Sequence, residues 1–159
     1  MTEITTYETL QAALNALAPE LADRAAEMDD ARRLPADLAG KMAAAGAFRM
    51  MTPKTYGGLE LTAREFIEGV EQIARANASA GWCCMIACTT SMNAAYMAPD
   101  MATEIYADPL TITGGVFARW AGLTWKAMAI ASPGAGNGAP AQPIAAGWRA
   151  AAWCSRMAS

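Results

Sequence analysis

Three cysteines share one apolar stretch of this chain, Cys83, Cys84 and Cys88, and a fourth, Cys154, lies near the end. Thiolates can bind zinc, attack electrophiles or form disulfides. A zinc site needs paired Cys-x-x-Cys spacings or histidine partners, and the chain contains no histidine. The first residues lack the basic start and apolar centre of a secretion signal, so a disulfide framework is not expected. We therefore interpret the cysteines as small buried apolar side chains and predict no metal site.

Two further kinds of chemistry are excluded on similar grounds. Histidine is the side chain that most often moves protons near neutral pH, and a histidine-dependent proton step cannot run in a chain with none. The glycine-rich segment GAGNG, Gly134–Gly138, follows no predicted strand and opens no predicted helix. It therefore does not have the context of a phosphate-binding loop.

Composition limits the class of protein further. A chain of 159 residues has the length of one domain and can bury a core. Its formal net charge of -3 argues against nucleic acid as a partner. No apolar run approaches the ~20 residues of a membrane-spanning helix. We expect a cytoplasmic protein that binds neither nucleic acid nor membrane.

The first hundred residues have the pattern of helices. Apolar residues at helical spacing predict helices over residues 6–32, with a kink or restart at Pro19, and over residues 34–46, ending at Gly46. A loop is predicted over residues 48–61. The helix that follows begins with a capping box formed by Thr62 and Glu65.

The next segment, residues 79–97, is apolar on nearly all sides, which predicts a central helix buried among neighbours or between subunits. A short helix follows over residues 98–109, and the β-branched run LTITGGVFA, residues 110–118, predicts a strand. The predicted fold class is therefore all-α, ending in one or two short β-strands and an irregular tail.

Three segments in order resemble the N-terminal helical domain of the acyl-CoA dehydrogenase superfamily: LPADLAGKMAAAGAFRMMTPKTYGG, LTAREFIEGVEQIARANASAGWCCMI and ADPLTITGGVFA. The resemblance covers about residues 10–118. The run ASAGWCCMIA, with Trp82, is more similar to the flavin-dependent two-component monooxygenases of this superfamily than to its fatty-acyl dehydrogenases. The resemblance predicts a helical domain over residues 1–109 and the first strand of a β-domain over residues 110–118.

The resemblance implies a flavin enzyme in the intact family. Its members have a helical N-terminal domain, a β-domain and a C-terminal four-helix bundle, with FAD or FMN between them, and are expected to be homotetramers. In the monooxygenase branch, reduced flavin from a partner reductase uses oxygen to hydroxylate a small aromatic substrate. In the dehydrogenase branch, a carboxylate in the C-terminal bundle removes a proton. The sequence does not choose the substrate or decide between the branches.

Four residues match positions near the flavin of the resembled family. Trp82 matches a helix aromatic that packs near the flavin ring, although it could equally be an ordinary core aromatic. Gly115, Val116 and Phe117 match a segment whose backbone would hydrogen-bond the flavin edge, although a strand end that merely turns would look the same. The monooxygenase branch often has a histidine shortly after the tryptophan, where this chain has CTTSMN. No catalytic residue is assigned.

The pattern is lost from Arg119 onward. Residues 119–159 contain no Asp or Glu, four basic residues and four of the five tryptophans, whereas a folded surface normally mixes both charges. Reading each third codon base with the next two bases forces Gly at Trp120–Ala121 and Glu at Trp125–Lys126, as a β-domain of this family would continue. We predict that residues 119–159 are out of frame and of low order.

Two functional hypotheses follow. The chain is either the N-terminal fragment of a flavin-dependent oxidoreductase that resembles acyl-CoA dehydrogenases and aromatic monooxygenases, or a catalytically inactive truncated product that acts at most as a helical interaction module. In both, flavin belongs to the intact family, and we expect this chain alone to bind none.

Overall fold

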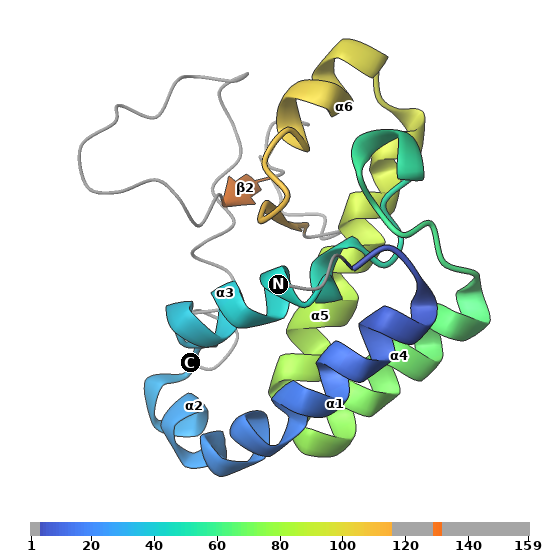
Figure 1. The fold of residues 1–159 in the computed structure, drawn as a ribbon. Helices are drawn as coiled ribbons and strands as arrows, with labels where there is room; N and C mark the ends of the chain where they lie inside the picture. Colours follow the sequence, from blue (N-terminus) through green and yellow to red (C-terminus); the bar gives the residue numbers. More distant parts are fainter. Residues whose placement is uncertain (1–3, 116–128, 132–159) are drawn as a thin grey trace.

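A computed structural model describes residues 4–115 and 129–131. These residues form helices and two short strands, which confirms the predicted all-α class (Figure 1). The α-helices are α1 (Tyr7–Asp23), α2 (Ala25–Ala31), α3 (Ala36–Ala44), α4 (Ala63–Ala76), α5 (Ala78–Ser91) and α6 (Pro99–Ile105). Short 3-10 helices η1 (Ala47–Arg49), η2 (Lys54–Tyr56) and η3 (Met92–Tyr96), and strands β1 (Ile112–Gly114) and β2 (Ala129–Ala131), complete the described chain.

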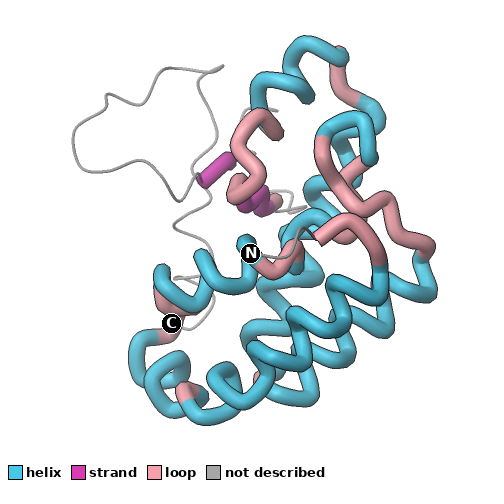
Figure 2. The backbone as a smooth tube through the Cα atoms, viewed as in Figure 1, coloured by secondary structure: helices cyan, strands magenta, loops and turns pink. Residues whose placement is uncertain are grey.

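Helices α1, α4 and α5 lie side by side, and α2 and α3 cover one end of this layer (Figure 1). The core contains the apolar stripe of α1, which consists of Leu10, Leu14, Leu17 and Leu21. Figure 2 shows that most of the loop lies toward the end that carries α6 and β1. The helical layer therefore forms a scaffold, and the irregular chain gathers beside the C-terminal half of α5.

The break between the first two helices lies at Arg24 rather than at Pro19. Pro19 sits inside a continuous α1, and the helix ends four residues later, at Asp23. Arg24 then forms ion pairs with Glu27 (2.6 Å) and with Asp37 of α3. These hydrogen bonds lower the pKa of both carboxyl groups. The predicted break in the helix is thus found at the ion-paired Arg24 and not at the proline.

The other predicted helix signals hold. Gly46 follows α3 with a φ of 77°, in the left-handed region that ends helices. Thr62 caps α4: its Oγ1 accepts the Glu65 backbone N–H (3.3 Å), and Glu65 Oε2 accepts the Thr62 N–H (2.8 Å). The predicted loop over residues 48–61 is held by backbone bonds, including Leu61 N–H to Met50 O (2.8 Å).

Helix α5 is apolar as predicted, and within the described chain one of its faces lacks the neighbours that the prediction expects from a larger protein or a second subunit. One face packs against α4 and η1 and is buried, but Trp82 on the other face is 50% exposed. The continuation through η3 exposes Tyr96. On the same side of the helix as Trp82, Met85, Ile86 and Thr89 are half-buried, so this uncharged face is only partly covered within the described ranges. The sequence pattern correctly indicates an apolar helix, but apolarity on all sides does not reveal which side the described residues cover.

Strands β1 and β2 pair antiparallel, with Thr113 opposite Ile130. Strand β2 lies inside residues 119–159, for which the sequence predicts low order, and the rest of that segment lies outside the described residues. Backbone pairing at an exposed strand edge places little demand on side chains. Among the described helices, none is both long and apolar enough to cross a membrane.

Candidate functional site

The candidate site lies where β1 meets the C-terminal half of α5. Two side chains from the strand side reach carbonyl groups on the helix: Thr113 Oγ1 donates to Ala87 O and the Tyr106 hydroxyl donates to Ser91 O, both at 3.5 Å. The Tyr106 and Thr113 oxygens lie 3.4 Å apart. Burial raises the pKa of Tyr106, so its hydroxyl keeps its proton. These hydroxyl groups join β1 to α5 and fix where the strand ends.

Gly115, which follows β1, lies directly against α5. A Cβ at this position would lie 3.1 Å from Thr90 Oγ1 and 3.5 Å from Thr90 Cγ2. The distance to Oγ1 is tighter than normal van der Waals contact, so the strand end can approach the helix this closely because it carries no side chain. The close approach leaves backbone atoms, rather than a side chain, at this edge.

Replacing Gly115 with alanine is therefore expected to lower the free energy of unfolding by about 1 kcal/mol, at the low end of the cost of overpacking. Thr90→Ala removes both contacting atoms, so the double variant should recover part of the loss. Urea denaturation of the wild type, both single variants and the double variant measures this coupling, which should exceed about 0.5 kcal/mol. Additive effects would contradict the contact between Thr90 and Gly115.

Of the four predicted site residues, the structure describes Trp82 and Gly115, which lie at separate places along α5. Trp82 is half-exposed on α5, so it is not an ordinary core aromatic within the described chain. Thr90, which touches Gly115, lies eight residues further along the helix, which is about 12 Å along the axis. Trp82 and Gly115 therefore belong to one helix–strand unit without contacting each other. Val116 and Phe117 lie outside the described residues.

The hydroxyl residues that stand where the resembled branch often has histidine bond to their own helix. Thr89 Oγ1 donates to Met85 O (2.9 Å) and Thr90 Oγ1 donates to Ile86 O (2.8 Å). Ser91 Oγ donates to Cys88 O (2.9 Å). Because each hydroxyl hydrogen is engaged by a backbone carbonyl, these groups bend or brace α5 rather than replace a proton-transferring histidine.

Two of the three cysteines of α5 confirm the interpretation as small buried side chains, whereas Cys83 is only half-buried. Cys84 and Cys88 are fully buried, and each Sγ lies 3.1 Å from the Ala47 carbonyl oxygen, to which it donates. The contact with Cys88 and burial raise the pKa of the Cys84 thiol, which keeps it neutral and unreactive. Within the ranges that the structure describes, no group of three or more His, Cys, Asp or Glu could hold a metal ion. Cys154 lies outside those ranges.

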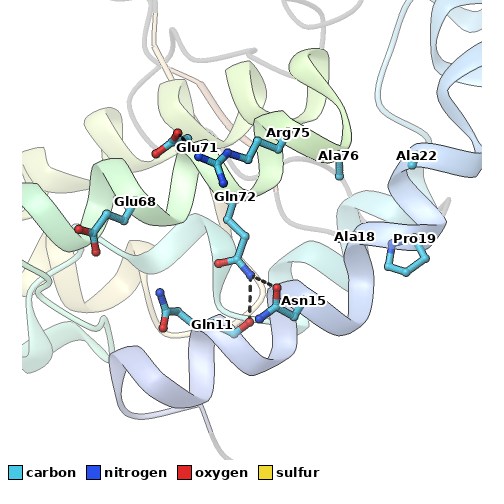
Figure 3. Close-up of a pocket in the computed structure, with 10 residues that line it drawn as sticks. All are labelled: Gln11, Asn15, Ala18, Pro19, Ala22, Glu68, Glu71, Gln72, Arg75 and Ala76. Atoms are coloured by element: carbon cyan, nitrogen blue, oxygen red, sulfur yellow. Dashed lines mark hydrogen bonds and ion pairs between the residues drawn. The ribbon is translucent and has the colours of Figure 1, made fainter.

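A shallow groove of about 760 Å³ lies between α1 and α4 (Figure 3). Gln72 Nε2 crosses it to donate to Gln11 O (3.1 Å) and Asn15 Oδ1 (2.7 Å), and Arg75 pairs with Glu71 (2.7 Å). The groove is lined by Gln11, Asn15, Ala18, Pro19, Ala22, Glu68, Glu71, Gln72, Arg75 and Ala76. Since Gln72 bonds across the helix interface and Arg75 is paired with Glu71 of its own helix, the groove is better explained as a helix-packing seam than as a reaction site.

The order of the helices, the glycine at the strand end and the apolar α5 can be compared with known protein families. Residues 6–104 match the family model described as acyl-CoA dehydrogenase, N-terminal domain. The chain belongs to this family. Among its curated relatives, the pigment production hydroxylase of Rhodococcus erythropolis is 38% identical to this chain over 107 residues. The indole-3-acetate monooxygenase of Pseudomonas putida is 35% identical over 112 residues.

The solved structure of the HsaA monooxygenase from M. tuberculosis is similar to this acyl-CoA dehydrogenase-type chain with a TM-score of 0.63 and 29% identity, over 67% of this chain and 28% of that one. The HsaA protein of Rhodococcus jostii, 39% identical over 69 residues, is a flavin-dependent monooxygenase, oxygenase subunit. The hydroxylase and the indole-3-acetate monooxygenase align with 67% and 66% of this chain, which spans only 27% and 28% of their own lengths. The resemblance to the superfamily is confirmed, and the relatives named here are monooxygenases and hydroxylases.

Sequence reasoning named Thr90 only as one of the residues that stand where the resembled branch often has histidine, and it did not identify Tyr106 or Thr113 as parts of this site. One usable signal was present in the sequence: Thr111 and Thr113 alternate with Ile112, the period of two expected of a strand. In the structure both threonines are buried and Ile112 is half-buried. Nothing in the pattern indicates that Thr90 would face the glycine, because that contact depends on how β1 crosses α5.

Proposed function

We propose that this chain supplies the N-terminal helical wall of a flavin-dependent monooxygenase site, with Trp82, Gly115, Val116 and Phe117 toward FAD or FMN. The observation that carries the proposal is the Gly115–Thr90 contact, which leaves bare backbone at the end of a strand beside an uncharged helix. Backbone N–H and C=O groups there could bond the polar edge of a flavin, and a half-exposed indole offers a flat apolar surface.

When bound, the flavin would supply the oxygen chemistry, transferring one oxygen atom from O₂ to a small aromatic substrate. The residues of this chain would position the ring and exclude water from it, through the indole of Trp82 and the backbone at Gly115. We assign no proton transfer to a described side chain. A partner reductase and a homotetramer belong to the same proposal, by resemblance to the family.

A hybrid enzyme tests this proposal. Residues 6–115 would replace the matching segment of the Pseudomonas putida indole-3-acetate monooxygenase, which would supply the remaining length. We expect the hybrid to bind reduced flavin, measured by anaerobic titration, and Trp82→Ala in the hybrid to weaken binding. The matched control is Tyr96→Ala, another exposed aromatic, on η3 beyond the helix. A folded hybrid that binds no flavin, or equal effects of the two variants, would contradict the proposal.

We also propose an alternative for the chain by itself, namely that it is catalytically inactive because residues 119–159 are read out of frame. This alternative is favoured by a 41-residue segment without a single carboxylate. The coding DNA tests it: a one-base insertion or deletion near the Ala118 codon, with an open shifted frame beyond, is the expected finding. The purified chain should then lack the visible absorbance band of oxidised flavin.

A further inference from the structure

Arg49 is a buried cation in η1, and 7% of the residue is exposed to solvent. Its guanidinium donates to carbonyl groups in two separate segments. Nη1 reaches Gly57 O (3.1 Å) and Tyr56 O (3.4 Å), and Nη2 reaches Tyr106 O (2.8 Å) and Asp108 O (2.7 Å). Burying a charge is costly unless it is hydrogen-bonded. Four carbonyl oxygens accept those bonds here, so this one side chain joins the two segments that carry them.

The geometry requires an arginine rather than any cation. A guanidinium is a planar fork with N–H groups on both sides, so it can serve two loops at once, whereas a lysine ammonium is a single point with three donors. Burial lowers the pKa of Arg49 and the charge of Asp108 acts in the opposite sense. Because an arginine side chain stays protonated in proteins, the guanidinium remains a cation although it is buried.

From Arg49, a continuous set of contacts leads to the candidate site. The guanidinium carbon lies 5.9 Å from the centre of the Tyr106 ring, and the hydroxyl of the same ring lies 3.4 Å from Thr113 Oγ1. The Asp108 carbonyl that Arg49 binds also accepts the backbone N–H of Thr111 (3.1 Å), just before β1. The turn from α6 into β1 is therefore tied to Arg49 at its start and to α5 at its end.

We propose that Arg49 is a positioning residue that sets where β1 lies on α5, and through β1 the position of Gly115. It acts on the chain segment from Tyr106 to Thr113, which Arg49 anchors to the loop at Tyr56–Gly57. Its consequence for flavin rests on the proposed function, but the placement of β1 does not.

Amide hydrogen exchange on the full chain, without flavin, tests this role. The variant is Arg49→Lys, and the control is Arg64→Lys, an exposed arginine paired with Glu68 on α4. We expect Arg49→Lys to speed exchange at the Thr111 and Thr113 amides by about tenfold or more, equivalent to losing one hydrogen bond's worth of local stability. Amides within α1 and α4 should change by less than about twofold, and Arg64→Lys should leave all of them unchanged.

A second variant keeps the test decisive if Arg49→Lys does not fold. Tyr106→Phe retains the ring beside Arg49 and removes only the hydroxyl that reaches Thr113 and Ser91. It should speed exchange at Thr113 while the helices stay protected. Wild-type exchange at Thr113 in this variant, or a uniform rise across all helices in Arg49→Lys, would overturn the proposal. Because no flavin is present, a failed hybrid enzyme would leave this result untouched, and the reverse also holds.

Discussion

Replacing Gly81 with alanine is expected to destabilise the chain by about 3 kcal/mol, near the upper end of the cost of overpacking a core. Gly81 lies on the buried face of α5, where this helix crosses α4. A Cβ there would lie 2.7 Å from Ala74 Cβ, 2.8 Å from Ala74 Cα and 3.0 Å from Ala74 N. Since two of these three atoms belong to the backbone of α4, no side chain can rotate away and the helices must separate. Urea denaturation measures the loss.

Gly40→Ala is the matched control. Gly40 is also inside a helix, α3, and a Cβ there would meet nothing within 4 Å. The same change should therefore stabilise the chain by about 0.4–1 kcal/mol, because alanine favours the helix and restricts the unfolded chain. If both variants shifted stability in the same direction, the close crossing of α4 and α5 would be contradicted.

The Gly81 crossing also concerns the candidate site, because Trp82 is the next residue. Moving α5 away from α4 would carry the half-exposed indole with it and change its surroundings. The fluorescence of Trp82 cannot be read alone, since the chain has five tryptophans. The difference between the spectra of Gly81→Ala and Gly81→Ala/Trp82→Phe gives the Trp82 signal in the variant. The difference between the wild type and Trp82→Phe gives the same signal in the wild type. The two signals should differ if the helix has moved.

Much of the fold follows from local signals in the sequence. The Thr62–Glu65 capping box and the helix stop at Gly46 depend on residues within one turn of each other, so a sequence can display them. The division between α1 and α2 could not be read in this way. Pro19 is the obvious interruption, yet the break at Arg24 is associated with a partner in α3, Asp37, which only the packed structure brings near.

The candidate site was predictable only where it resembles the family. Trp82 and Gly115 were named from that resemblance and their place at a flavin stays a prediction, whereas the contacts of Arg49 with Tyr106 and of Thr90 with Gly115 join residues more than 20 positions apart. Gly81 and Gly40 make the same point: both are helical glycines in the sequence, and only the distance to Ala74 separates a required glycine from a replaceable one. Sequence patterns record periodicity, but they do not record how closely two elements approach.

The second large effect is expected at Leu10 in α1. Its side chain is fully buried, and its methyl groups lie 3.7 Å and 4.0 Å from where a Cβ on Gly46 and Gly69 would be, so it fills the space between the turn after α3 and helix α4. Leu10→Ala should reduce the free energy of unfolding by about 2–5 kcal/mol, from lost apolar burial together with the cavity that remains. Ile67→Ala, at a side chain that is 61% exposed, should change it by less than about 0.5 kcal/mol.

The same variant decides whether the helical layer and the β1 segment are one cooperative unit. Leu10 lies far along the chain from Thr111 and Thr113, but Ile112 between them packs against the same apolar core as Leu10. If the described chain unfolds in a single two-state transition, Leu10→Ala should raise exchange at Thr113 as much as at the α4 amides. An α6–β1 segment whose exchange ignores Leu10→Ala but responds to Arg49→Lys would instead be a separate, weaker unit, held to the helices mainly by that one buried cation.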